Sequence, residues 1–598
     1  MKLIKWIFVF LFNFLLVVSN QINAQSSQTA HDQLHQLFKD AWEFTLRENP
    51  LMATARGDLR YNDRLSDATP QAFERRYSMQ RKFLERLHEI PREQLSEEDQ
   101  LNYDLFETQL QWNLKEFEFG SYLAPVHQRS GFHLFLPRMH ERVPLRTHRH
   151  YEDYLKRLEA IPDYIAQHIE LLKLGLKKGI TPPRLVLKAV PKQVDALLSR
   201  PVEDFPLFQP FKKFPRSFNS EEQRALRMRA KNIITQQIYP AFKKFKTFFQ
   251  KEYIPQASEE IAVTRRIPNG KAFYAFRIRR FTTTNLTARD IHELGLKEVA
   301  RIKKRMLELI AQTGFNGSFK EFIQFLRTDS RFYYDDPEQL LIGYRNICKK
   351  MDAELPRLFG KLPRMPYGVR AVPDYEAPQA TTAYYNAPSP DGTRPGWFYA
   401  NTYDLKSRPK YEMEALAFHE SVPGHHLQIA LQQELKNVPE FRTQARFTAF
   451  VEGWGLYAES LGKEVGFYQD PYSEFGALSY EMWRALRLVV DTGIHAFGWS
   501  REKAINYMLE NSALTRTNVV NEVDRYIAWP GQALAYKIGQ LKIRELRTHA
   551  EEALGENFDL RAFHDLVLSA GAIPLNILEK RVMRWIRQQK HAIQKSTE

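Results

Sequence analysis

The stretch His419-Glu-Ser-Val-Pro-Gly-His-His-Leu-Gln428 carries more recognisable chemistry than any other segment of this chain of 598 residues. A His-Glu dipeptide followed within one or two helical turns by another histidine is the core of a zinc-hydrolase site. In such sites two imidazoles hold the metal, and the glutamate handles the proton of a water molecule. His419, Glu420 and either His425 or His426 are therefore candidate site residues.

The spacing of these histidines departs from the usual His-Glu-x-x-His, because the position four residues after His419 is Pro423. On a straight helix His425 would lie about 240° around the axis from His419, and His426 would lie about 10.5 Å along it. Neither could share an ion whose bonds are about 2 Å long. Pro423-Gly424 can interrupt the helix. We expect this break to return His425 to the side of His419, with His426 as the alternative.

A third metal ligand is expected downstream. His-Glu occurs four times in the chain, but only at His419 does a histidine follow within the five residues after the glutamate. Glu452 lies 27 residues after His425 in the helix-like run Phe450-Val-Glu-Gly-Trp-Gly-Leu-Tyr-Ala-Glu459. We expect Glu452 to complete the metal site. Glu459 shares its helix face and is expected to orient an imidazole.

The chemistry of a zinc hydrolase assigns roles to further residues. Zn²⁺ would polarise a water molecule and the substrate carbonyl, while Glu420 would take the proton of the water and pass it to the leaving nitrogen. A donor must stabilise the oxyanion. Tyr526 is the first candidate, followed by Tyr536 and His495, although each tyrosine could instead be a packing residue. A guanidinium could receive a substrate carboxylate; the candidates are Arg484, Arg516 and Arg525.

Residues 1–24 have the pattern of a secretory signal peptide. Lys2 and Lys5 precede an apolar run of 13 residues, Trp6 to Val18, that only Asn13 interrupts, and a small residue, Ala24, suits cleavage. The run is shorter than the roughly 20 residues of a membrane-spanning helix. We therefore expect a periplasmic or secreted protein without membrane attachment after cleavage. The single cysteine, Cys348, does not follow the cleavage point, so no lipid anchor is expected there.

The composition is that of an ordinary globular protein, with 43% hydrophobic and 26% charged residues. The net charge of +15 would suit nucleic acid. However, the basic residues are interleaved with acidic ones along helix-like segments, and no RNA-binding or zinc-finger pattern occurs. We expect no nucleic-acid partner.

Apolar residues at intervals of three and four predict a mainly α-helical fold. The predicted helices before the site are 30–48, 71–90, 97–116, 151–177, 221–250, 288–312 and 337–358. Between 362 and 408 proline, glycine, tyrosine and threonine accumulate, and two runs, 380–387 and 396–402, predict a β-ribbon. Helices resume after 411. A soft boundary near 285 would separate an N-terminal half, 25–285, from the half that carries the site, 286–598.

In these motifs the chain resembles the domain of unknown function 885 family of bacterial proteins. The resemblance rests on five segments in the same order and covers about residues 30–590: 281–287, 419–428, 452–459, 490–495 and 530–539. It implies a gluzincin-like zinc metallopeptidase with a two-lobed, mostly α fold, a deep channel and a small sheet beside the metal helix.

A channel of that kind would favour short peptides as substrates. It could be lined by aromatic residues of the ribbon, namely Tyr384, Tyr385, Trp397 and Tyr399. Two other functions remain open. One is a helical binding protein without catalysis, and the other is a zinc amidohydrolase that acts on a non-peptide amide.

Overall fold

The structure is a computed structural model of the chain that describes residues 28–597, except 375–376, 378–379, 390–391 and 393. It is mainly α-helical with one small sheet, as the sequence predicts. The predicted signal peptide, 1–24, lies outside the described residues. Within the described part, no helix combines the length and apolar character needed to cross a membrane.

The chain divides into two compact units. The first comprises the described residues up to Ser258 together with Val438–Phe441, and the second comprises Glu259–Asn437 and the residues from Arg442 onward. The sequence places a soft boundary near 285, and the residues between 259 and 285 belong to the second unit in the structure. All five motifs of the family resemblance therefore lie in the second unit.

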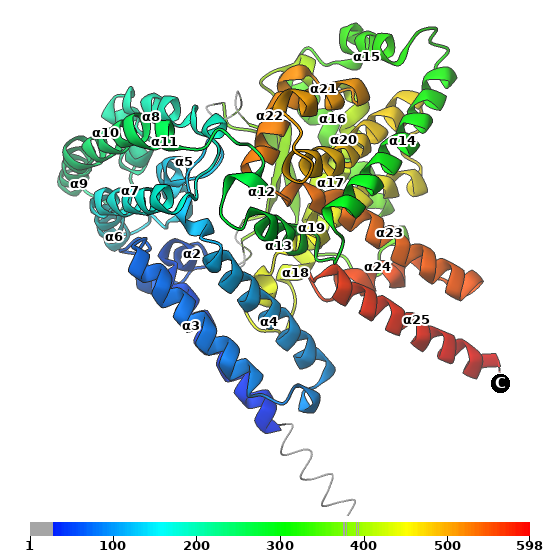
Figure 1. Ribbon diagram of the computed structural model, residues 1–598, viewed down its shortest axis with the longest axis horizontal. Coiled ribbons are helices and arrows are strands. Elements are labelled where there is room, and N and C mark those ends of the chain that lie inside the picture. The colour runs from blue at the N-terminus through cyan, green and yellow to red at the C-terminus, as the bar shows by residue number, and fades with distance from the viewer. Residues whose placement is uncertain (1–27, 375–376, 378–379, 390–391, 393, 598) are drawn as a thin grey trace, which may run out of the picture. The chain divides into compact units, whose positions relative to one another are not determined.

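The first unit begins with a helix at 28–48. It continues with α2 (Pro50–Ala55), α3 (Pro70–His88), α4 (Glu97–Glu118), α5 (Phe132–Phe135), α6 (His148–Glu159), α7 (Ile161–Lys178), α8 (Val190–Leu198), α9 (Ser220–Ile233), α10 (Tyr239–Phe248) and α11 (Ile254–Gln256) (Figure 1). The predicted helix 221–250 is present as α9 and α10, joined by a π-helical turn at Ile234–Ile238 just before Pro240. One apolar cluster packs the helix 28–48 against α3 and α4 through Leu34, Phe38, Phe83 and Phe106.

The second unit contains the longest helices. They are α12 (Val263–Arg266), α13 (Gly270–Thr282), α14 (Ala288–Gln312), α15 (Phe319–Thr328), α16 (Pro337–Leu358), α17 (Met413–Glu420), α18 (His425–Gln433), α19 (Thr448–Leu461), α20 (Pro471–His495), α21 (Arg501–Asn511), α22 (Arg516–Ala528), α23 (Ala535–Leu554), α24 (Leu560–Leu568) and α25 (Leu575–Thr597). The most extensive packing is between α14 and α20 and between α19 and α23. As a result α19, which carries Glu452, is fixed along its length by a long neighbour.

The small sheet has three strands in the order β1-β3-β2. The predicted ribbon is confirmed: β2 (Ala383–Asn386) runs antiparallel to β3 (Gly396–Ala400). A strand that the sequence analysis did not anticipate, β1 (Tyr367–Ala371), pairs with β3 in parallel. β1 contacts α16, and β2 contacts α17. The sheet therefore lies beside the helix that carries His419.

Candidate metal centre

The helix that begins the His-Glu motif is interrupted, as the sequence predicts. α17 ends at Glu420, and α18 begins at His425. The turn between the two helices is spanned by a hydrogen bond of 3.0 Å from the N–H of His426 to the carbonyl oxygen of Ser421. A Cβ atom at Gly424 would lie 2.1 Å from the carbonyl oxygen of His419, so only glycine fits this turn.

The turn is attached to α19 by a tryptophan. The indole Nε1–H of Trp454, a fully buried residue, donates to the carbonyl oxygen of Pro423 at 2.9 Å. At the start of the turn, the hydroxyl of Ser421 donates to the carbonyl oxygen of Ala417 at 2.6 Å. Buried backbone groups outside a helix need such partners. The same helix that supplies Glu452 therefore also holds the turn that precedes His425.

His419, His425 and Glu452 meet in the second unit. Oε2 of Glu452 lies 3.7 Å from Nε2 of His419 and 3.5 Å from Nε2 of His425, and the two imidazole rings are nearly perpendicular with centroids 4.6 Å apart. One nitrogen or oxygen atom of each residue lies within 4.8 Å of the others. Ligand atoms around tetrahedral zinc, with bonds of about 2.0–2.1 Å, are about 3.3 Å apart. The three residues thus fit a zinc ion with little movement.

The imidazole of His419 is oriented by two further features of α19. Nδ1 of His419 lies 2.7 Å from Oε1 of Glu459, which is also buried. A carboxylate at Nδ1 keeps the proton on that nitrogen and leaves the lone pair of Nε2 for a metal. A Cβ at Gly455 would lie 2.8 Å from Cε1 of His419. The ring therefore lies directly against the helix backbone, which explains the glycine three residues after Glu452.

The carboxylates concentrate negative potential at this point. Burial alone would lower the pKa of His419, but its interactions with Glu452 and Glu459 outweigh burial and raise that pKa to about 9. Burial likewise opposes ionisation of Glu452, yet the facing imidazoles hold its pKa well below the usual range. The site therefore attracts positive charge, which a proton or a metal cation can supply.

A buried guanidinium balances Glu459. Nη2 of Arg484 lies 3.5 Å from Oε1 of Glu459, and its guanidinium packs over the rings of Tyr480 and Trp483. Arg484 therefore acts on the carboxylate behind His419 in this structure. The other two arginines considered for a substrate carboxylate are paired as well, Arg516 with Glu502 at 3.3 Å and Arg525 with Glu522 at 3.0 Å.

Glu420 ends α17 directly after His419, and its side chain is half-buried. It is thus adjacent in the chain to the first candidate ligand and retains access to solvent. His425 is enclosed, and its Nδ1 has no hydrogen-bond partner among the described residues. Only His419 of the two imidazoles is therefore oriented by a carboxylate.

His426, the alternative ligand, lies outside this group. Its Nδ1 is 2.8 Å from the hydroxyl of Tyr385, and its Nε2 is 3.0 Å from the carbonyl oxygen of Met365. The ring also packs on Tyr367 with a centroid distance of 4.7 Å. Burial lowers the pKa of His426 to about 4. This histidine joins α18 to the sheet, and His425 is the one that faces Glu452.

His495 is a core histidine in the structure. It is 0% exposed; its Nδ1 accepts the N–H of Val263 at 3.2 Å, and its Nε2 lies 3.0 Å from the carbonyl oxygen of Tyr526. Burial lowers the pKa of His495 to about 3. Both nitrogens thus serve backbone groups. A role for His495 in stabilising an oxyanion stays a prediction.

Arg487 contacts both candidate tyrosines, Tyr526 and Tyr536. The hydroxyl of Tyr526 donates to Oε2 of Glu522 at 2.8 Å and accepts from Nε of Arg487 at 3.2 Å. The guanidinium of Arg487 lies over the ring of Tyr536 at 4.3 Å. No hydrogen bond between the described residues connects either tyrosine to the three candidate ligands. Their proposed catalytic roles also stay predictions.

Sequence reasoning did not anticipate the contributions of Trp454 and Gly455. The available signal was the unusual Gly-Trp-Gly sequence that follows Glu452 at once. Glycine in a helix commonly marks the close approach of another segment. The contacted residue lies 36 residues earlier in the chain for Gly455 and 31 residues earlier for Trp454. The Gly-Trp-Gly sequence therefore indicated close packing of this helix but did not identify the residues that it contacts.

Comparison with known proteins identifies relatives over most of the chain. The family described as bacterial protein of unknown function (DUF885) matches residues 50–582. The crystal structure of the putative lipoprotein from Colwellia psychrerythraea has a TM-score of 0.89 at 30% identity, with 94% of this chain and 99% of that chain covered. A putative lipoprotein of unknown function from Shewanella oneidensis has a TM-score of 0.65 at 16% identity, with the same coverage, and shares the fold. The search of curated proteins found no match.

Proposed function

The chain belongs to the DUF885 family of bacterial proteins of unknown function, and we propose that it is a zinc-dependent metallopeptidase that hydrolyses short peptides. The observation that carries the proposal is the meeting of His419, His425 and Glu452, with ligand atoms within 4.8 Å of one another. Two imidazoles and one carboxylate are a usual ligand set for catalytic zinc, which keeps a further position open. Such mixed nitrogen and oxygen ligands favour zinc over magnesium or calcium.

We assign a separate role in hydrolysis to each residue of the candidate metal centre. His419, His425 and Glu452 would hold the ion, and Glu459 would keep His419 in the orientation that presents Nε2. When bound, zinc supplies Lewis-acid chemistry that polarises a carbonyl group and makes water a better nucleophile at neutral pH. Glu420 would accept the proton of the attacking water at its carboxylate and deliver it to the leaving nitrogen.

The sheet offers a means of holding a peptide. β2 is at the edge of the sheet, and within the described residues it pairs only with β3. Its Tyr385 bonds to His426, the residue after the candidate ligand His425. An extended peptide could add to such an edge through its backbone. This arrangement favours a peptide over a non-peptide amide, because only a peptide repeats the backbone donors and acceptors.

We also propose that the protein acts outside the cytoplasm. The signal-peptide pattern at 1–24 supports export, and two proteins of similar structure are described as putative lipoproteins. Lipoproteins of bacteria are exported proteins.

The test combines metal analysis with hydrolysis of a mixed peptide library by the wild type, Glu420→Gln and Glu452→Ala. We expect Glu420→Gln to keep the zinc at this centre and lose turnover, and Glu452→Ala to lose both. Equal turnover in all three proteins would end the peptidase proposal. A wild type that binds zinc but cleaves only non-peptide amides, such as cell-wall fragments, would support the amidohydrolase. A wild type that binds peptides without cleaving them would support the binding protein.

A further inference from the structure

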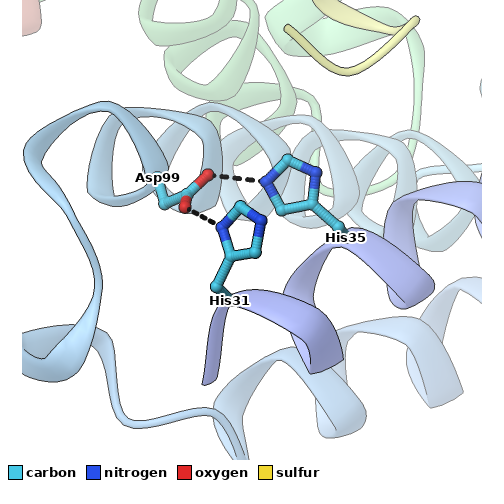
Figure 2. A group of neighbouring side chains, drawn as sticks. All are labelled: His31, His35 and Asp99. Atoms are coloured by element: carbon cyan, nitrogen blue, oxygen red, sulfur yellow. Dashed lines mark hydrogen bonds and ion pairs between the residues drawn. The ribbon is translucent and has the colours of Figure 1, made fainter. Parts of the chain in front are cut away.

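A second set of metal-ligating side chains lies in the first unit. His31 and His35 are four residues apart in the helix 28–48, so their imidazoles leave the same face one turn apart. Figure 2 shows both rings turned toward Asp99, which lies in the first turn of α4. Nδ1 of His31 is 2.6 Å from Oδ2 of Asp99, and Nε2 of His35 is 2.8 Å from Oδ1. The two imidazoles thus contact different oxygen atoms of the same carboxylate.

The carboxylate of Asp99 is positioned by its own helix. Its side chain is only 7% exposed. Its backbone N–H donates to the hydroxyl of Ser96, the N-cap of α4, at 3.2 Å, and the amide of Asn102 donates to Oδ1 at 3.1 Å. These contacts hold the acid in place independently of the histidines. Because the carboxylate is already held in position, less conformational entropy is lost when an ion binds.

The imidazoles, in contrast, are partly exposed to solvent. The side chains of His31 and His35 are 45% and 28% exposed. Their ring centroids are 4.1 Å apart. Ligand atoms around a zinc ion are about 3.3 Å apart, so the contacts to Asp99 need to lengthen by only about 0.5 to 0.7 Å to admit one. The ion would then take the place of the N–H hydrogens at Nδ1 of His31 and Nε2 of His35, and each neutral ring would carry its proton on its other nitrogen.

We propose that His31, His35 and Asp99 bind a divalent transition-metal ion, with zinc as the first choice. Two imidazoles with i, i+4 spacing and one carboxylate suit zinc, and also nickel and copper, better than calcium or magnesium. Of the described residues, only this set and His419, His425 and Glu452 bring three such ligand atoms within 4.8 Å. The ion would join the helix 28–48 to α4 and stabilise the first unit. It is independent of the hydrolysis proposed for the second unit.

A nearby pair provides the control. His88 at the end of α3 lies 2.8 Å from Oε1 of Glu107 on α4, so it makes the same kind of contact between two helices with a single imidazole. One histidine and one carboxylate leave too few ligands for tight zinc binding. His88→Gln should therefore change another helix contact of α4 without removing a metal ion.

The experiment measures zinc retained per protein after chelator treatment, reloading and dialysis of the full mature chain. Glutamine can still donate to Asp99, so His31→Gln/His35→Gln keeps the contact between helices while it removes both nitrogen ligands. We expect two equivalents of zinc in the wild type and in His88→Gln, and one equivalent in His31→Gln/His35→Gln. His419→Gln/His425→Gln should retain one equivalent, and the combination of both pairs should retain none.

The outcomes separate this inference from the proposed function. A single equivalent that His31→Gln/His35→Gln removes would support the second site and contradict the first. Two equivalents retained in His31→Gln/His35→Gln, or no zinc in His419→Gln/His425→Gln, would overturn the second site.

Thermal unfolding gives an independent readout. Zinc should raise the midpoint of His419→Gln/His425→Gln, because an ion that binds only the folded state stabilises it. Adding the substitutions at 31 and 35 should abolish that rise, and an unchanged rise would contradict the site.

Discussion

The indole of Trp454 donates a 2.9 Å hydrogen bond to the carbonyl oxygen of Pro423, across 31 residues of sequence. Pro423 belongs to the turn between α17 and α18, and Trp454 stands two residues after Glu452 on α19. The bond therefore links the turn before His425 to the helix that carries Glu452, the proposed third ligand. We expect the geometry of the proposed metal centre to depend on this link as well as on the three side chains.

Trp454→Phe should weaken zinc binding without removing a ligand. The substitution leaves the carbonyl of Pro423 without its donor, which costs about 1–3 kcal/mol in a buried site. The turn should then shift and lower zinc affinity at this centre, measured by competition with a chromophoric chelator. Trp499→Phe is the control, since Trp499 packs between His292 of α14 and Tyr507 of α21. Equal zinc affinity in the two variants would show that the link does not matter.

Gly455→Ala should displace His419. The new methyl group would lie 2.8 Å from Cε1 of the imidazole, closer than such contacts allow, so the ring must leave its position against α19. We expect at least a tenfold loss of zinc affinity. Gly295→Ala creates a clash of the same 2.8 Å with Leu488 between α14 and α20. It should lower the midpoint of unfolding but leave zinc binding intact, and a loss of zinc there would mean that helix packing in general controls the site.

Glu459→Gln should test the orientation of His419 without changing the shape of the site. Glutamine still accepts a hydrogen bond from Nδ1, but it removes the charge that strengthens the imidazole as a ligand. Loss of such a partner commonly weakens metal binding by about 10- to 100-fold. Zinc titration of the variant measures this directly. Glu464→Gln, which alters an ion pair of the same region with Arg547, is the control and should bind zinc like the wild type.

The free energy of unfolding should fall steeply in acid because of His495. Its folded pKa of about 3 lies below the ordinary value of 6.5. Protonation would also break the bond that Nδ1 accepts from Val263. The stabilisation is thus present above pH 6.5 and is lost as the pH falls from 6.5 toward 3. Urea unfolding across this range should show a shallower pH slope for His495→Gln.

The exposed His591 supplies the control for that measurement, since His591→Gln should keep the slope of the wild type. An identical slope in His495→Gln would mean that this histidine is not held neutral by the fold. Part of the acid sensitivity should remain in His495→Gln, because burial also lowers the pKa of His426 and His133 to about 4.

Local sequence patterns predicted several helices and the interruption between His419 and His425, although the predicted helix 151–177 is divided into α6 and α7. The i, i+3 and i, i+4 spacing of apolar residues gave α14 and α16 within a residue or so of their observed ends. The failure of a straight helix to bring His419 and His425 together, with Pro423-Gly424 between them, predicted the turn. Each of these features depends on residues close together in the chain, which is why it could be inferred.

Features that depend on distant partners could not be inferred in this way. β1 is a five-residue strand whose pairing with β3 joins residues 29 apart, and its Tyr-Gly-Val-Arg-Ala sequence has little strand pattern of its own. The spacing of His31 and His35 was visible, but Asp99 lies 64 residues after His35. The choice between His425 and His426 likewise required the position of Glu452, which only the packing of α19 provides.

We expect one zinc ion to lie between His419, His425 and Glu452. Anomalous diffraction at the zinc edge, from crystals grown with zinc, tests it most directly. We expect a peak about 2.0–2.2 Å from Nε2 of both histidines and from a carboxylate oxygen of Glu452. Crystals in which these side chains point apart, with no anomalous peak between them, would contradict it.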